Sequence, residues 1–233
     1  MTDLTAPIIT IDGPGGSGKG TVGYELAKKL GWHFLDSGAL YRILAYVASS
    51  KQLFESDIEL KEESVIDSIC NEALNFNLKF NSKILLDNCD ITDAIRTESI
   101  GNLASKIAVV PRIRQALLES QRIFQKQPGL VADGRDMGTV VFPKAELKLY
   151  LTASAEVRAQ RRFLQLQGKG IHVSLPNLIE EIRVRDERDS NRSAAPLKPA
   201  TDAVIIDSSD LNISQVLEIA HKHYSRVFST SSI

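Results

Sequence analysis

Residues 8–21 hold the side chains and glycines whose spacing points most directly to chemistry. The β-branched run at residues 8–11 favours a buried strand, and residues 21–30 have the apolar spacing of a helix. Between them, four glycines within six residues allow a tight turn whose backbone N–H groups point inward. This order favours a site for the phosphates of a nucleoside triphosphate over a glycine-rich turn that binds nothing. The residues expected at the phosphates are Gly13, Pro14, Gly15, Gly16, Ser17, Gly18, Lys19, Gly20 and Thr21.

One position of this loop departs from the common pattern. A Ser or Thr usually follows the lysine directly and places a hydroxyl on Mg²⁺. Here Gly20 follows Lys19, and Thr21 comes one residue later. Whether the Thr21 hydroxyl touches the metal is therefore left open. The Gly-Lys-Gly-Thr form resembles nucleoside monophosphate kinases more than GTPases or motor ATPases.

An acidic residue ends another expected strand, at residues 130–133. In a nucleotide-binding sheet, a carboxylate in this place commonly holds the metal or its waters. We therefore expect Asp133 to hold Mg²⁺ through water. Arg135 and Asp136 follow on the same edge.

Several basic residues offer binding groups for a second substrate. Residues 36–42 follow an expected strand at 32–36, so Arg42 either binds a phosphate or is an exposed arginine on a capped helix. Two arginine-rich helices are expected at residues 154–166 and 177–192. Each presents either a solvated, salt-bridged face or a face that meets phosphates, and the glycines after the first favour a mobile lid.

Alternation of strands and helices predicts the fold class. Five short strands are expected, at residues 8–12, 32–36, 130–133, 147–152 and 203–207. Strands that alternate with helices form a parallel sheet flanked by helices, and their carboxyl ends meet at one edge. A hairpin pattern, with alternating residues 74–80 and a second run at 84–86, predicts an insert in this α/β core.

Composition restricts the class of protein. The 233 residues carry a net charge of −1, so no overall field favours nucleic acid or an anionic membrane. The apolar runs are far shorter than the ~20 residues of a membrane span. Two cysteines without metal-ligand spacing suit a reducing compartment, and we expect a cytoplasmic protein. Arginines and aspartates gather at the strand ends without a Cys–His or Ser–His–Asp arrangement, which indicates phosphoryl transfer by positioning and charge stabilisation.

These motifs together resemble the bacterial cytidylate kinases over nearly the whole chain. The resemblance rests on the glycine loop and on residues 36–42, 132–143 and 185–192, and the block at 132–143 is the most specific. It implies transfer of the γ-phosphoryl group of ATP to CMP or dCMP with Mg²⁺, by a monomer. It also implies one P-loop kinase domain over residues 1–233, with a core at 1–60, 104–153 and 171–233, a nucleotide-binding insert at about 61–103 and a lid at about 154–170.

The resemblance assigns roles that fit the chemistry of the matching side chains. A carboxylate at residue 136 can accept from the N4 amino group of cytosine, whereas uracil would present a carbonyl there. The residues implied at CMP are Ser37, Tyr41, Arg42, Ser105, Arg114, Arg135, Asp136, Arg185, Asp189 and Arg192. The residues implied to be catalytic are Lys19, Arg135, Arg158, Arg162, Arg188 and Arg192, and the last four would neutralise charge between the donor and acceptor phosphates.

Two alternatives compete with this reading. A UMP or AMP kinase would share the loop and the lid but not the pairing of Asp136 and Arg114 with cytosine. An ATP-binding switch would hydrolyse ATP slowly without an acceptor. The second arginine-rich edge argues against a switch, because a switch needs no second phosphate site.

Overall fold

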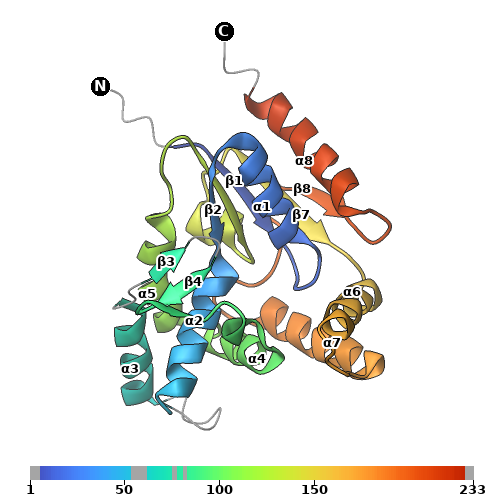
Figure 1. Cartoon of the computed structure of the whole chain (residues 1–233). Helices are drawn as coiled ribbons and strands as arrows, with labels where there is room; N and C mark the ends of the chain where they lie inside the picture. The colour runs from blue at the N-terminus through green and yellow to red at the C-terminus, as the bar shows by residue number, and fades with distance from the viewer. Residues whose placement is uncertain (1–5, 54–61, 75–77, 81–82, 229–233) are drawn as a thin grey trace, which may run out of the picture. The chain divides into compact units, whose positions relative to one another are not determined.

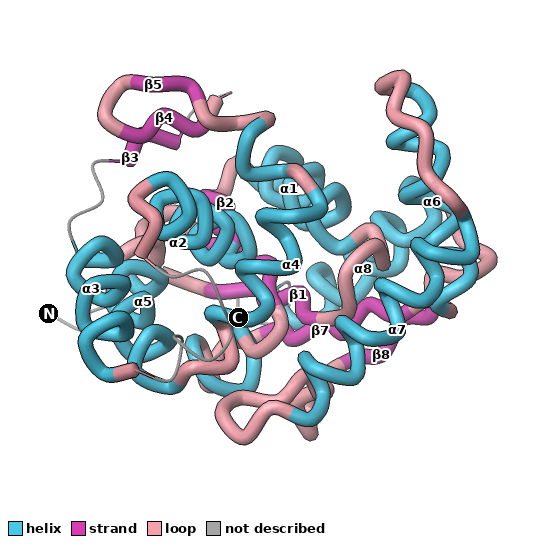
Figure 2. The backbone as a smooth tube through the Cα atoms, turned by 90° about the horizontal axis from the view of Figure 1, so that it is seen from below, coloured by secondary structure: helices cyan, strands magenta, loops and turns pink. Residues whose placement is uncertain are grey.

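The computed structural model describes residues 6–53, 62–74, 78–80 and 83–228 (Figures 1 and 2). The chain divides into two compact units, one of Met1–Asp36 with Arg122–Ile233 and the other of Ser37–Gln121. Within these described ranges, no helix is long and apolar enough to cross a membrane.

A parallel five-stranded sheet forms the centre of the first unit. Its strands lie in the order β2-β6-β1-β7-β8. Their bounds are β1 Ile8–Asp12, β2 His33–Asp36, β6 Leu130–Gly134, β7 Leu147–Thr152 and β8 Val204–Asp207. All five residues of β1 and of β6 are buried, which explains why central strands have continuous apolar runs instead of alternation. The predicted parallel sheet is confirmed.

Helices flank this sheet. The helices of the first unit are α1 Lys19–Leu30, α6 Ala155–Gly168, α7 Leu175–Asn191 and α8 Ile213–Phe228, with a short π-helical turn, η3, at Met137–Val141. α1 and α8 lie side by side (Figure 1) and bury Leu26 and Val216 against Ile11 and Leu149 of the sheet. α6 and α7 pack on each other through Ala159 and Leu178.

The carboxyl ends of the strands meet at one edge. In the parallel register, Asp36 lies opposite Asp133, Asp12 opposite Gly134, and Thr152 opposite Asp207. The glycine loop after β1 and the acidic block after β6 therefore start from the same edge, as predicted.

The second unit combines helices with a small antiparallel sheet. Its helices are α2 Ser37–Ser50, α3 Glu63–Leu74, η2 Ala94–Arg96, α4 Glu98–Ile107 and α5 Pro111–Arg122. Its strands are β3 Leu78–Phe80, β4 Ile84–Leu86 and β5 Cys89–Asp90, in the order β3-β4-β5. Leu44, Ile69, Ile107 and Leu117 pack into one core.

Some local expectations for this unit were wrong. Leu74 ends helix α3 instead of beginning a strand, and β5 was not predicted because two residues carry no detectable period. The sequence also favours Ser37 as the N-cap of the helix after residue 36, but Ser37 is the first residue of α2. The sequence also predicts an acidic amphipathic helix at residues 55–72 and a turn at residues 81–82. The first part of that helix and the turn lie outside the described residues. The expected insert, residues 61–103, lies within the second unit.

Candidate active site

The loop between β1 and α1 needs glycine for steric reasons. A Cβ on Gly13 would lie 2.0 Å from the carbonyl oxygen of Leu151, and the φ of Gly13 is +148°. A Cβ on Gly16, whose φ is +81°, would lie 3.1 Å from Cβ of Arg158. The glycine spacing therefore reflects close approach of β7 and α6 as well as the turn itself.

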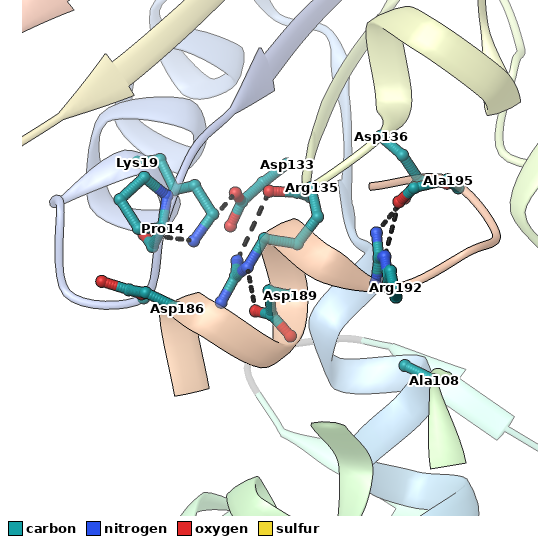
Figure 3. Close-up of polar contacts among 12 residues, drawn as sticks. Pro14, Lys19, Ala108, Asp133, Arg135, Asp136, Asp186, Asp189, Arg192 and Ala195 are labelled. Atoms are coloured by element: carbon teal, nitrogen blue, oxygen red, sulfur yellow. Dashed lines mark hydrogen bonds and ion pairs between the residues drawn. The ribbon is translucent and has the colours of Figure 1, made fainter. Parts of the chain in front are cut away.

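Lys19 and Asp133 lie together beneath this loop (Figure 3). The Lys19 ammonium donates to the carbonyl of Pro14 at 3.3 Å and lies 3.9 Å from Oδ1 of Asp133. Burial, with the Arg135 charge added, lowers the pKa of Lys19 to about 8. Burial raises the pKa of Asp133 to about 7 against the pull of Lys19. Asp133 Oδ1 accepts no hydrogen bond from the described residues, so it has capacity for a ligand.

The departure at Gly20 has a steric cause. A Cβ at this position would lie 3.1 Å from Oδ2 of Asp133. The carboxylate from β6 thus occupies the space that a Ser or Thr side chain would need. Thr21, one residue later, is exposed.

Two arginines from outside the loop face its backbone. A Cβ on Gly15 would lie 3.3 Å from Nη2 of Arg135 and 3.8 Å from Nη1 of Arg185. Arg135 Nε donates to Oδ2 of Asp189 at 3.1 Å. Burial would raise the pKa of Asp189, but Arg135, Arg185 and Arg192 outweigh burial and hold this pKa below its usual range.

Arg158 is engaged with the loop instead of pointing into solvent. Its Nη1 donates to the carbonyl of Gly15 at 3.1 Å, and its Nε donates to the carbonyl of Ala153 at 2.9 Å. Both terminal nitrogens donate to the carboxylate of Asp186 on α7. This buried guanidinium therefore joins α6 and α7 to the glycine loop.

Ser208 and Arg161 hold the other side of the loop, and the sequence predicted neither role. The Ser208 hydroxyl donates to the carbonyl of Ser17 at 2.9 Å, and Arg161 Nη1 approaches the same carbonyl at 3.4 Å. Arg161 belongs to the arginine face expected on α6, but no local pattern marks Ser208. Arg162, from the same face, donates to Oε1 of Gln165 at 3.4 Å.

Asp136 lies beside Arg192 in the interior. Their Oδ1 and Nη2 atoms are 3.8 Å apart, and Arg192 Nε donates to the carbonyl of Ala195 (Figure 3). Arg188 comes from the same helix, α7, and is partly buried, with no hydrogen-bond partner for its Nη1 among the described residues.

Asp12 is a buried acidic residue that was not among the site residues expected from the sequence. Its carboxylate accepts from the backbone N–H groups of Met137 and Gly138, each at 2.8 Å. Burial raises its pKa to about 6 against these two hydrogen bonds. The strand-end argument that selected Asp133 could have selected Asp12 too.

The remaining expected residues lie in the second unit. Ser37 accepts from Nε2 of Gln121 at 2.9 Å, and Ser105 is buried. The Arg114 guanidinium lies 5.6 Å from the ring centre of Tyr41. Arg42 is not a simple exposed arginine, because its Nη1 donates to the carbonyl of Ile95 at 2.8 Å.

The first unit thus gathers most of the expected site. It contains the whole glycine loop together with Asp133, Arg135, Asp136, Arg158, Arg162, Arg185, Arg188, Asp189 and Arg192. The second unit contains Ser37, Tyr41, Arg42, Ser105 and Arg114. Among the described residues, no group of three or more His, Cys, Asp or Glu could hold a metal.

Comparison with known proteins adds the following. A family model described as cytidylate kinase matches residues 9–226. The cytidylate kinase of Pseudomonas fluorescens (strain Pf0-1) is 54% identical over 220 residues, which cover 91% of this chain and 93% of that protein. The cytidylate kinase of Shewanella sp. (strain MR-4) is 52% identical, over 97% of this chain and 98% of that protein.

Proposed function

The chain belongs to the cytidylate kinase family, and from this premise we propose how its residues divide the transfer of a phosphoryl group from ATP to CMP. Membership makes the protein a nucleoside monophosphate kinase that phosphorylates CMP with ATP. One observation carries the residue assignment. The guanidinium of Arg135, from the acidic block, faces the loop at Gly15, with Nη2 3.3 Å from the place of a Cβ there. This closeness supports an assignment in which donor and acceptor groups lie at one edge of the sheet.

The donor side consists of the glycine loop and Lys19. Loop N–H groups and the N-terminus of α1 supply positive potential to the ATP phosphates. Lys19 is buried, and its lowered pKa means that an arriving phosphate would stabilise its charged form. Arg158 and the Ser208 hydroxyl hold loop carbonyls from outside, which keeps the N–H groups free for phosphate.

Asp133 is the residue that would hold the metal. Its buried Oδ1 has spare acceptor capacity, and the lack of a larger acidic cluster among the described residues fits a Mg²⁺ held mainly by ATP phosphates and water. Mg²⁺ bound in this way would neutralise phosphate charge. Asp133 would orient its waters, and Thr21, which is exposed, is a weaker candidate ligand.

The residues proposed to bind CMP would recognise its base and bind its sugar and phosphate. Asp136, beside Arg192, would accept from N4 of cytosine, and Ser37, Ser105 and Arg114 would complete base recognition. Arg185 and Asp189 would bind ribose hydroxyls. The CMP phosphate would be held by Tyr41, Arg42 and Arg135. We extend the acceptor to dCMP, because base and phosphate contacts are the same in both nucleotides.

Charge neutralisation completes the mechanism. A phosphate monoester is largely dianionic near pH 7, so the acceptor oxygen needs no general base. Arg188 and Arg192, with Arg158 and Arg162, would offset the charge that gathers between donor and acceptor phosphates. Residues 154–170 would act as a lid that excludes water from the transfer. We also propose a cytoplasmic monomer without nucleic-acid or membrane partners, in keeping with the net charge of −1.

Product analysis tests this function. Purified protein with ATP, Mg²⁺ and CMP should form CDP and ADP in equal amounts, and ADP formation should be negligible without an acceptor. Steady ADP formation that does not depend on CMP would instead indicate the ATP-binding switch.

A further inference from the structure

We propose that Asp12 is a positioning residue that fixes Arg135 and Asp136 for recognition of CMP, an inference that rests on the proposed function. Asp12 is the last residue of β1 and directly precedes the nucleotide loop. Both oxygens of its buried carboxylate are used: Oδ1 accepts from Met137 N and Oδ2 from Gly138 N, each at 2.8 Å.

These two N–H groups need a partner from outside their own helix. They open the π-helical turn η3, and the first N–H groups of a helix have no intrahelical acceptor. The first bond within the turn runs from Val140 N to the carbonyl of Asp136 at 2.9 Å. A carboxylate at this end also meets the positive end of the backbone dipoles. Asp12 therefore caps η3 from a strand 125 residues away in sequence.

Asp12 is also placed close to the other end of the segment that carries Arg135 and Asp136. Asp12 lies opposite Gly134 in the parallel register of β1 and β6. Arg135 and Asp136 are the two residues between Gly134 and Met137, so this short segment runs from the β6 position opposite Asp12 to the N–H groups bonded to the Asp12 carboxylate. Their backbone cannot shift without breaking a ladder position or a charge-assisted hydrogen bond.

The fit around the cap leaves no spare room. A Cβ on Gly138 would lie 2.8 Å from Oγ1 of Thr10 and 3.3 Å from Oδ2 of Asp12. A Cβ on Gly134 would lie 2.7 Å from Cγ of Met137. A side chain at residue 138 would therefore force the N–H group away from the carboxylate.

The test disturbs this contact from both sides. Asp12→Asn replaces one acceptor oxygen with an amide NH₂ that opposes a backbone N–H, and Gly138→Ala displaces the donor. In each variant we expect KM for CMP to rise about tenfold or more, while KM for ATP changes little. Asp210→Asn makes the same chemical change at an exposed position after β8, and its kinetics should match wild type.

The kinetic results separate the positioning role of Asp12 from the CMP kinase activity of the protein. Folding is checked by circular dichroism and thermal unfolding. An unchanged KM for CMP in folded Asp12→Asn and Gly138→Ala, with a wild type that phosphorylates CMP, would overturn the inference and leave the proposed function intact. Equal rises of KM for CMP and ATP, or loss of folding in both variants, would assign Asp12 to the loop or the sheet and also overturn it. A wild type inactive on CMP would overturn both.

Discussion

The Lys19 ammonium and the Asp133 carboxylate are 3.9 Å apart, with side chains only 10% and 8% exposed. At this distance they attract each other without forming a hydrogen bond, so the attraction does not offset the desolvation of both charges. Burial therefore moves both pKa values toward the neutral forms. In the proposed mechanism, a phosphate beside Lys19 and a cation beside Asp133 would stabilise the charged form of each group.

Lys19→Ala is expected to lower kcat about 100- to 1,000-fold, because it removes a preorganised charge from the transferred phosphoryl group. Lys29→Ala is the matched control, since Lys29 lies exposed in the last turn of the same helix. Steady-state kinetics with ATP and CMP provide the measurement. Turnover of Lys19→Ala close to that of Lys29→Ala would refute the role of the loop lysine.

Asp133 should make stability depend on pH in the metal-free protein. Its carboxyl has a pKa of about 7 in the folded chain, against 3.8 for the ordinary group. Between these values the folded chain keeps a proton that the unfolded chain has released, so the contribution of Asp133 to stability falls as pH rises.

Urea unfolding at pH 5 and pH 7 in the presence of a chelator tests this sign. The free energy of unfolding of wild type should fall relative to that of Asp133→Asn between the two pH values. This window lies below the pKa of Lys19, which is about 8. A difference that stays flat or grows with pH would contradict the raised pKa.

Among the elements, the glycine loop has little room for a side chain at Gly20. Gly20→Ser restores a hydroxyl directly after Lys19, but its Cβ would lie 3.1 Å from Oδ2 of Asp133. We expect a loss of about 1–3 kcal/mol in the free energy of unfolding and a lower kcat. Chemical denaturation is compared with Gly168→Ser, because a Cβ on Gly168 has no atom within 4 Å. A Gly20→Ser protein as stable and active as wild type would show that the steric account is wrong.

Two arginine–carboxylate pairs between α6 and α7 differ sharply in burial. Arg158 is buried and bonds both Asp186 and the loop, so Arg158→Ala should lower the free energy of unfolding by at least about 2 kcal/mol. Arg183 and Glu156 are 57% and 55% exposed, and Arg183→Ala should cost less than about 1 kcal/mol. Urea unfolding of both variants gives the comparison, and similar losses would contradict it.

Elements differ in how well the sequence predicts them. The central strands β1, β6 and β7 were found because buried parallel strands have apolar runs between turn signals. The edge strands β2 and β8 are only partly buried and were found from their place in the alternation of strands and helices. β5 was missed because it contains two residues. The capping role of Asp12 and the contact of Ser208 with Ser17 depend on backbone groups 125 and 191 residues away, and no local pattern encodes such pairs.

For the molecule as a whole, the net charge does not show that positive side chains gather around the glycine loop. The chain carries −1 in total, yet Arg135 and Arg185 face Gly15 while Arg158 and Arg161 hold loop carbonyls. The net charge gives no reason to expect a polyanionic partner, but it cannot show a local field for phosphates. Motif spacing supplied that information, because strand ends in a parallel sheet converge.

We propose that this edge of the sheet selects CMP as the phosphoryl acceptor. The most direct test measures kcat/KM with saturating ATP for CMP, dCMP, UMP, AMP and GMP. CMP should be the best substrate and dCMP should be used, while UMP should be at least about 100-fold poorer because its carbonyl would face the buried Asp136 carboxylate. A kcat/KM for AMP or UMP equal to or above that for CMP would show that this edge does not select CMP.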